Sequence, residues 1–389
     1  MLLIKNAELL APETGGRCDL LLGGGKILRM EADLRIPRKY CEVIDARNLI
    51  TVPGFIDGHV HMMGGGGEGG FKTRTPGLQL SDAIRGGVTT VVGCLGTDGI
   101  TRTMAGLLAK AKGLEEEGLS TYLFSGSYDV PLRTLFGSLE EDLLFIDKVI
   151  GAGEVAISDH RSSQPTFEAL AQLAGTARRG GMLSGKAGLV NLHLGDGARG
   201  LELLRRILDE TEIPATQFLP THMNRNPHLF EEGLAYAKGG GYVDFTTSTV
   251  KAYLEDGEVP CGTALKRMLD AGVDPGHITF TSDGQGSLPV FDDGGRLRGI
   301  SVGRVTTLYA AVRDAVLRDK VPLATALRVI TANPAHILKL RGKGHLAPGL
   351  DADVVLLDPR DLEVHTVIAM GRVLMRDRKI LVKGTFEQA

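Results

Sequence analysis

Cysteine is scarce in this chain of 389 residues. The four cysteines stand at positions 18, 41, 94 and 261, far apart and without a C-x-x-C pair. This spacing argues against a zinc ribbon or a disulfide framework and fits a reducing compartment. The chain also lacks an 18-residue apolar run, and its start lacks a basic segment followed by an apolar one. We therefore expect a cytoplasmic protein without a membrane partner.

An excess of charge of either sign is missing as well. The 44 lysines and arginines nearly balance the 47 aspartates and glutamates, which gives a formal net charge of −3. No basic footprint for phosphates follows from this balance, so we expect no nucleic-acid partner. Hydrophobic residues at 43% and charged residues at 23% are ordinary for a globular protein. Both a disordered chain and a coiled-coil rod are excluded by these proportions.

Glycine, in contrast, is abundant, with 53 residues in the chain. This is about twice the usual share of roughly 7%, and no Gly-X-Y period accompanies it. The excess predicts many tight turns or close backbone approaches.

The two ends of the chain share one texture, in which short apolar runs alternate with glycine or charged residues. Such runs are typical of a small antiparallel sheet. Because both ends have this texture and the long middle does not, we expect one small domain formed by residues 1–50 and 346–389. The segment between them, residues 51–345, is then a separate unit.

That middle segment alternates short β-branched runs with longer stretches of helical spacing, which predicts repeated β/α units. Eight such units in about 290 residues indicate an α/β fold of the (β/α)₈ barrel type, whose active site lies at the carboxyl ends of the strands. The expected strands cover residues 55–61, 89–94, 120–125, 154–158, 189–194, 218–222, 242–247 and 278–283. The expected helices cover residues 78–86, 100–117, 140–149, 166–179, 200–209, 227–238 and 262–271.

Several histidines close these strands. His59 and His61 end the first one, and their i, i+2 spacing places both rings on one face of it. His193, His222 and Asp283 end the fifth, sixth and eighth strands in the same way. A single histidine at a strand end is often only a satisfied polar residue. Five ligand-type side chains directed at one barrel mouth instead predict a metal centre.

The remaining six histidines lie in loop-like or turn-like sequence, so we assign them no metal role. They are His160, His228, His277, His336, His345 and His365.

Motifs at these strand ends resemble those of the amidohydrolase superfamily, a group of metal-dependent barrels with a small β-sandwich built from both chain ends. The superfamily resemblance is carried by Pro53-Gly-Phe-Ile-Asp-Gly-His-Val-His61, Thr-Ser-Asp283 and Gly349-Leu-Asp-Ala-Asp-Val-Val-Leu-Leu357.

A narrower likeness spans nearly the whole chain. It resembles the isoaspartyl dipeptidases, which hydrolyse β-aspartyl dipeptides at a binuclear zinc site and commonly assemble into homo-oligomers. The segments that carry it are His59 to Glu68, Thr73-Arg-Thr-Pro76, Gly96-Thr-Asp98, Ala156 to Arg161, Leu219 to Asn226, Ser282 to Ser287 and Gly384-Thr-Phe386.

One ligand departs from that pattern. In the family a lysine carboxylated by CO₂ bridges the two metals, and at its place this chain has Glu154. Carbamate and glutamate each carry one negative charge and two hard oxygens, so the exchange is chemically plausible. Glutamate is shorter by about three bonds, or roughly 3 to 4 Å at full extension. We expect the backbone to approach through a bulge at Gly151-Ala-Gly153. The alternative is an unliganded carboxylate beside a single metal.

Substrate-binding residues follow from the charges of a β-aspartyl dipeptide, which has one ammonium and two carboxylates. The resemblance implies that Glu68 pairs with the ammonium and that Thr97 contacts the substrate. Arg161 and Arg225, which follow strand ends, suit bidentate carboxylate binding. Ser287 could bind the second carboxylate.

A rival reading of the glycine-rich segment 64–70 is a dinucleotide loop, because it contains a formal G-x-G-x-x-G. That reading is weak, since no helix follows the segment and no acidic residue ends a second strand about 20 residues later.

The expected mechanism uses two zinc ions bridged by Glu154 and a hydroxide, with His59, His61, His193, His222 and Asp283 as further ligands. Asp283 acts as general base and then as general acid toward the leaving amine. Tyr128, after the third strand, donates a hydrogen bond to the developing oxyanion.

Two alternatives stay open. The chain could be another amidohydrolase, namely a dihydroorotase, a hydantoinase or an N-acetyl-sugar deacetylase. It could also be a non-catalytic scaffold that keeps the barrel and loses the metal, although every ligand position here is filled.

Overall fold

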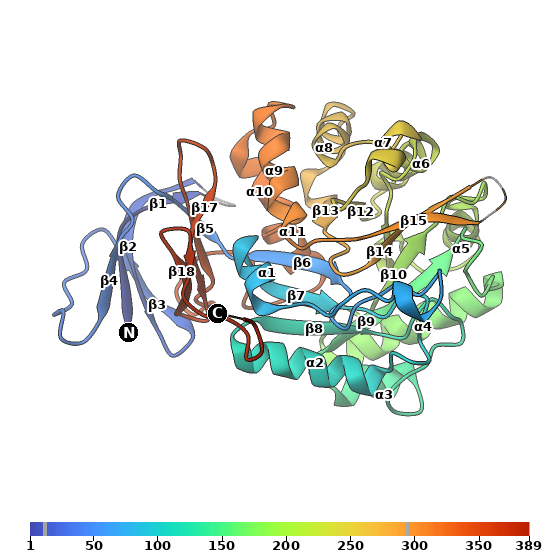
Figure 1. The fold of residues 1–389 in the computed structure, drawn as a ribbon, viewed down its shortest axis with the longest axis horizontal. Coiled ribbons are helices and arrows are strands. Elements are labelled where there is room, and N and C mark those ends of the chain that lie inside the picture. Colours follow the sequence, from blue (N-terminus) through green and yellow to red (C-terminus); the bar gives the residue numbers. More distant parts are fainter. Residues whose placement is uncertain (11–13, 293, 295, 389) are drawn as a thin grey trace.

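The computed structural model describes residues 1–10, 14–292, 294 and 296–388. A β-sheet that contains strands from both chain ends lies at one end of the molecule, and a larger body of strands and helices forms the rest (Figure 1).

The larger body contains the eight expected parallel strands, which confirms the α/β barrel fold. They are β6 (Phe55–Val60), β7 (Val88–Gly93), β8 (Ser120–Ser125), β9 (Val149–Ile157), β10 (Leu189–Leu194), β11 (Phe218–Thr221), β12 (Val243–Thr246) and β13 (Ile278–Thr281).

Strand β9 differs most from the expectation, because it begins at Val149 and not near Glu154. The helix expected over residues 140–149 accordingly ends at Phe145. Gly151 and Gly153 lie within the strand and interrupt its β-branched pattern, and glycine weakens a strand signal in a sequence.

The backbone ladder of the barrel is not continuous. Six strands pair in the order β11-β10-β9-β8-β7-β6, while β12 pairs with β13 alone in the described part of the chain. Asp244 on β12 accepts hydrogen bonds from Thr221 on β11 (2.5 Å) and from Thr279 (2.7 Å) and Thr281 (2.6 Å) on β13. One buried side chain thus ties β11, β12 and β13 together.

Helices pack around this barrel, and their starts follow the sequence. The side chains of Thr103, Ser138, Thr166 and Asn226 each accept a hydrogen bond from a backbone N–H in the first turn of the following helix, as N-cap residues do. The helices are α1 (Leu80–Arg85), α2 (Met104–Glu117), α3 (Leu139–Phe145), α4 (Phe167–Ser184), α5 (Glu202–Glu210), α6 (Pro227–Lys238), α7 (Lys251–Glu255), α8 (Cys261–Asp270), α9 (Thr307–Leu317), α10 (Leu323–Arg328) and α11 (Ala332–Ile337).

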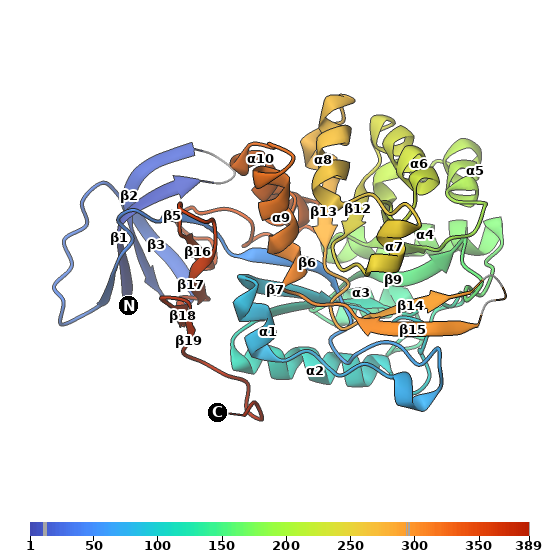
Figure 2. The ribbon, with the colours of Figure 1, turned by 45° about the horizontal axis from the view of Figure 1, so that its top comes forward.

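Two elements near the barrel mouth were not expected from the sequence. One is the short helix α7, and the other is a hairpin of β14 (Ser287–Phe291) and β15 (Leu297–Val302), which Figure 2 shows beside α7. Tyr253 of α7 and Ser287 of the hairpin line the same cavity, so both elements add walls to that end of the barrel.

The smaller sheet joins both chain ends in the order β19-β18-β17-β16-β5-β1-β2-β3, with β4 on β1. Its halves share one apolar core, which includes Ile4, Leu22, Val354 and Ile368. The strands are β1 (Leu2–Leu10), β2 (Thr14–Gly23), β3 (Lys26–Glu31), β4 (Glu42–Asp45), β5 (Ile50–Pro53), β16 (Val354–Leu357), β17 (Val364–Ala369), β18 (Arg372–Arg376) and β19 (Lys379–Ile380).

A buried lysine connects the sheet to the barrel. The Lys343 ammonium lies 2.6 Å from the Asp353 carboxylate and 2.9 Å from the Asp351 carboxylate, and it donates to the Ser120 hydroxyl at the start of β8 (2.6 Å). Burial lowers the pKa of Lys343, but the two carboxylates raise it more, so the net shift is upward.

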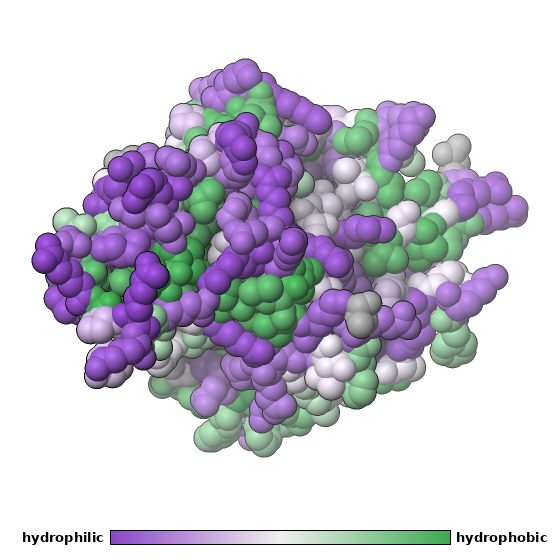
Figure 3. Space-filling model, turned by 60° about the vertical axis from the view of Figure 1, so that its left-hand side comes forward, coloured by the Kyte–Doolittle hydropathy of each residue, from purple (hydrophilic) through white to green (hydrophobic). Residues whose placement is uncertain are grey.

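The face that includes the small sheet is mostly hydrophilic, with a compact hydrophobic patch near its middle (Figure 3). Among the described residues, no helix combines the length and the apolar character that a membrane crossing needs.

Candidate active site and metal centre

The first strand of the barrel carries two of the predicted ligands into the interior. His59 lies within β6 and is fully buried, and His61 follows the strand. Nε2 of His59 lies 2.9 Å from Oε2 of Glu154, and Nε2 of His61 lies 3.0 Å from Oδ1 of Asp283. Nδ1 of His59 faces the Asn191 side-chain oxygen at 3.1 Å. One ring nitrogen of each histidine therefore points to the centre of the cluster.

Glu154 reaches this cluster because β9 carries one extra residue. Its pairing with β10 shifts between Ala152, opposite Val190, and Val155, opposite Leu192. Gly153 lies in this bulge at φ 138°, and a Cβ there would lie 2.7 Å from the carbonyl oxygen of Asn191. Only glycine fits such a close approach at positive φ. The bulge thus lies directly before Glu154, whose carboxylate contacts the histidines of the cluster.

His193 and His222 complete the other half of the cluster. Nδ1 of His193 lies 3.5 Å from Oε2 of Glu154, and Nε2 of His222 lies 3.7 Å from the same oxygen. His222 Nδ1 is held by the Thr246 hydroxyl at 2.6 Å. Ligand atoms of Glu154, His193 and His222 all lie within 4.8 Å of one another.

Two of the six residues adopt left-handed backbone conformations, His222 at φ 65° and Asp283 at φ 52°. Non-glycine residues rarely do so, and those that do cluster at functional sites. His222 directly follows β11, and Asp283 lies two residues beyond β13. The turn directs each side chain back over the strand ends.

A divalent metal fits this donor set. His59 Nε2, Glu154 Oε2 and Asp283 Oδ1 are buried and make no well-directed hydrogen bond among the described residues, although His59 Nε2 lies 2.9 Å from Glu154 Oε2 and Asp283 Oδ1 lies 3.0 Å from His61 Nε2. A buried polar atom without a partner is costly unless a ligand or water satisfies it. Four imidazoles and two carboxylates are also the donors that zinc prefers.

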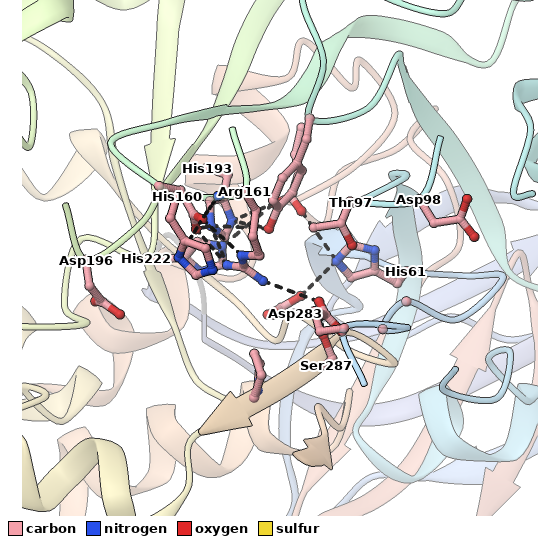
Figure 4. Close-up of a pocket in the computed structure, with 18 of the residues that line it drawn as sticks. His61, Thr97, Asp98, His160, Arg161, His193, Asp196, His222, Asp283 and Ser287 are labelled. Atoms are coloured by element: carbon pink, nitrogen blue, oxygen red, sulfur yellow. Dashed lines mark hydrogen bonds and ion pairs between the residues drawn. The ribbon is translucent and has the colours of Figure 1, made fainter. Parts of the chain in front are cut away.

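A cavity of about 270 Å³ opens above the cluster and is lined by all the predicted substrate-binding residues. This volume is close to the lower end of the range for small-molecule pockets, which is roughly 300–1,000 Å³. In Figure 4, Arg161, His193 and His222 lie on one side of the cavity and His61 on the other, with Asp283 between them. The cavity therefore suits a small molecule that touches the cluster.

Residues predicted for opposite charges of the substrate are neighbours. Oε1 of Glu68 accepts a hydrogen bond from Ser287 (2.9 Å) and lies 3.3 Å from NH1 of Arg161. An amino acid carries its ammonium and carboxylate on one carbon, so adjacent acidic and basic groups suit it. Thr97 lines the cavity nearby, beside Asp98.

The two arginines differ in what already binds them. Arg161 donates to Asp159 through Nε (3.0 Å) and NH2 (2.6 Å). Arg225 lies 3.4 Å from Glu258 through Nε and stacks 4.5 Å above the Tyr253 ring. Among the described residues, no hydrogen bond engages its NH1 or NH2. Arg225 thus offers the open fork for a carboxylate.

The Tyr128 hydroxyl lies near both ring nitrogens of His193, 2.9 Å from Nδ1 and 3.2 Å from Nε2. Burial, and then the Glu154 charge, raise the pKa of Tyr128 well above its usual value. The phenol therefore stays protonated and can donate a hydrogen bond.

Sequence reasoning missed the residues that hold the predicted ligands in place, above all Asn191, Thr246 and Asp159. Asn191 had a usable signal, because it stands two places before His193 and so shares its face of β10. Arg102 was also missed; it donates to the carbonyl oxygen of Gly65 at 2.7 Å and fixes the glycine-rich segment. Cys94 lies 3.9 Å from His61 Nδ1, on the side of the ring away from Asp283.

Comparisons with known proteins agree with this geometry. The profile of the amidohydrolase family matches residues 259–374. The chain is 47% identical to the β-aspartyl dipeptidase of Fervidobacterium islandicum AW-1, solved with a β-Asp-Leu dipeptide; the match covers 97% of this chain and 98% of that one, at a TM-score of 0.90. The chain belongs to the β-aspartyl dipeptidase family of the amidohydrolase superfamily. As a member, it is a metal-dependent hydrolase.

Two further proteins are less similar to this β-aspartyl dipeptidase family member. It is 26% identical to a dihydroorotase of Aquifex aeolicus (strain VF5) over 72% of its length, and the match spans 62% of that enzyme. A dihydropyrimidinase of Brevibacillus agri NCHU1002 shares 17% identity at a TM-score of 0.68, which reflects the common fold.

Proposed function

We propose that this enzyme hydrolyses the isopeptide bond of β-aspartyl dipeptides at a centre of two zinc ions bridged by Glu154. One observation carries the proposal above all others: the near full-length likeness, at 47% identity, to a dipeptidase solved with β-Asp-Leu. The cavity supports it, because its acidic and basic groups match those of such a substrate.

The six clustered residues would hold the metal ions, with His59 and His61 on one side of Glu154 and His193 and His222 on the other. Asp283 lies nearest to His61, at 3.0 Å. When bound, the ions would polarise the amide carbonyl and lower the pKa of the attacking water.

Side chains of the protein carry out the proton transfers and bind the substrate. Asp283 accepts the proton of the attacking water and returns it to the leaving amine. Tyr128 donates a hydrogen bond from its phenol to the carbonyl oxygen of the substrate, where negative charge develops. Glu68 binds the ammonium of the aspartyl residue.

We assign the binding of the substrate carboxylates from the contacts that each arginine already makes within the chain. Arg225, with its open fork, binds the carboxylate of the leaving residue. Arg161, already bound by Asp159, contributes NH1 next to Glu68. Thr97 and Ser287 complete the polar wall.

Three broader expectations belong to the same proposal. They are the cytoplasmic location, the homo-oligomer, and the division into residues 1–50, 51–345 and 346–389. Strand β5 (Ile50–Pro53) pairs within the small sheet, so the proposed first segment is extended from residue 50 to Pro53.

A substrate comparison tests the proposal against its nearest rivals. We expect the zinc-loaded enzyme to hydrolyse β-Asp-Leu and to leave α-Asp-Leu, dihydroorotate and N-acetylglucosamine 6-phosphate essentially untouched. The reaction is followed by release of free leucine or of the corresponding product. A higher kcat/KM for any of the last three compounds would contradict the proposal.

A further inference from the structure

Asp159 touches both halves of the site. It lies two residues beyond β9, and its carboxylate contacts a predicted metal ligand and a predicted substrate-binding residue at once. Its side chain is only 4% exposed. The carboxylate is therefore shared between two groups with different tasks.

Toward the metal centre, the carboxylate holds the outer edge of His193. Oδ2 of Asp159 lies 2.9 Å from Nε2 of His193, whereas Nδ1 of the same ring faces Glu154. A carboxylate at one ring nitrogen keeps the proton there and leaves the other nitrogen free to bind a metal. Asp159 thus sets the tautomer and the orientation that a ligand at Nδ1 needs.

Toward the substrate, the same carboxylate binds Arg161 by two nitrogens, Nε and NH2. The third nitrogen, NH1, faces Glu68, which in turn accepts from Ser287. Contacts therefore run without a gap from His193 to the proposed ammonium site.

The Asp159 side chain occupies space that a side chain at position 195 would need. A Cβ on Gly195, just beyond β10, would lie 2.5 Å from Cβ of Asp159 and 2.6 Å from its Oδ2. Gly195 follows His193 by two residues, so the space for Asp159 is made by the same strand end that carries the ligand.

A role in loop structure alone does not account for the carboxylate. The backbone of Asp159 also holds the loop beyond β9, because its carbonyl oxygen accepts from the backbone of Ser162 and the side chain of Gln164, and Ser158 and Ser162 add further bonds that do not use the carboxylate. The carboxylate adds one bond to the loop backbone, from Arg161 N (2.7 Å). Its remaining hydrogen bonds go to His193 and the Arg161 guanidinium.

We propose that Asp159 is a positioning residue that couples the metal centre to the substrate subsite: it fixes His193 for metal binding and Arg161 for substrate binding through one carboxylate. The inference rests on the proposed function for its substrate half. The part of the inference that concerns metal binding rests only on the metal-ligating side chains of the cluster.

The test compares Asp159→Asn with the wild type and with Asp209→Asn, an exposed control on α5. Zinc affinity is measured without substrate, by titration against a chelating indicator. We expect Asp159→Asn to bind one of its two zinc ions about 10–100-fold more weakly, and Asp209→Asn to match the wild type. Equal zinc affinities of Asp159→Asn and wild type would overturn the proposal.

The second readout is the KM for β-Asp-Leu at saturating zinc. We expect Asp159→Asn to raise it about tenfold, since a charge-assisted contact to Arg161 is weakened. An unchanged KM would refute the coupling even if zinc binding were weakened. If the wild type does not hydrolyse β-Asp-Leu, the proposed function fails, whereas the zinc comparison still decides the metal half.

Gly195→Ala offers a route that keeps the carboxylate. The added methyl would displace Asp159, so we expect the same two changes, smaller in size, with an unchanged circular dichroism spectrum. Wild-type zinc affinity and KM in this variant would contradict the packing argument.

Discussion

Two buried clusters of charge in this protein are built on opposite principles. Around Lys343, at the junction of sheet and barrel, the ammonium has two carboxylates and a hydroxyl within 2.9 Å. At the barrel mouth, three buried atoms of the predicted ligand set make no well-directed hydrogen bond among the described residues, although each lies within 3.0 Å of another predicted ligand. The first cluster is complete within the chain, and the second is complete only with a ligand.

This difference separates structural charge from functional charge. A paired buried charge that loses its partner destabilises the fold, because the remaining charge is left uncompensated. When a cluster of metal-ligating side chains loses one of them, the main loss is in metal affinity and not in the stability of the fold. Mutations in the two clusters should therefore change different measurements.

The largest effect is expected for Glu154→Ala. Loss of the bridging carboxylate should leave at most one zinc ion per chain after dialysis, measured by atomic emission, and a turnover of β-Asp-Leu too low to detect. Glu255→Gln, an exposed change on α7, is the control. Two tightly held ions with near-normal turnover would show that Glu154 is not the bridge.

Asp283→Asn should separate proton transfer from metal binding. We expect most of the zinc to remain, and kcat for β-Asp-Leu to fall about 10²–10⁴-fold, the usual contribution of a general acid or base. Steady-state kinetics together with metal analysis measures both. A loss of less than about tenfold would remove Asp283 from the proton-transfer role.

Lys343→Met tests the paired cluster. Removing the ammonium leaves the buried Asp353 carboxylate without its cation, while the half-buried Asp351 keeps Lys26, so the free energy of unfolding should fall by about 3–5 kcal/mol. Urea denaturation measures this, and zinc content should not change. Lys251→Met, whose ion pair is exposed, should cost less than about 1 kcal/mol; similar costs for the two variants would show that burial is irrelevant here.

The smallest effect concerns pH, measured as the stability difference between wild type and Lys343→Met. Burial raises the pKa of Asp351, but Lys26 and Lys343 lower it more, so its net shift is downward. The contribution of Asp351 is present above an unfolded-state pKa of about 3.9 and is lost as pH falls through the lower folded value.

The raised pKa of Lys343 acts at the other end of the pH scale. Its contribution is present below about pH 10.4 and is lost as pH rises through the higher folded value. The stability difference should therefore be constant between about pH 5 and 9 and shrink outside that window. A difference that changed across neutral pH would point to another titrating group.

The same contrast explains what could be predicted from the sequence. The eight strands were predictable because short apolar runs alternate with stretches of helical spacing, and histidines at three strand ends indicated a shared barrel mouth. Glu154 was found by its place before a recognisable motif. The start of β9 at Val149 was missed, since Gly151 and Gly153 hide a strand whose glycines serve a bulge.

Partners across the fold could not be predicted. Asp159 and Thr246 lie far in sequence from the histidines they hold, His193 and His222, and no local pattern marks such pairs. Lys343 likewise meets Ser120 only in the folded chain. These contacts depend on strand register and loop path, which local periodicity leaves open.

Glu154, directly after the bulge of β9, has a consequence for how the enzyme matures. A carbamate on lysine forms only when dissolved CO₂ reacts with a neutral amine, so its yield depends on bicarbonate and on pH. A bridge made by an encoded carboxylate needs neither. With Glu154 as the bridge, metal uptake after folding would not depend on dissolved CO₂, even in degassed buffer.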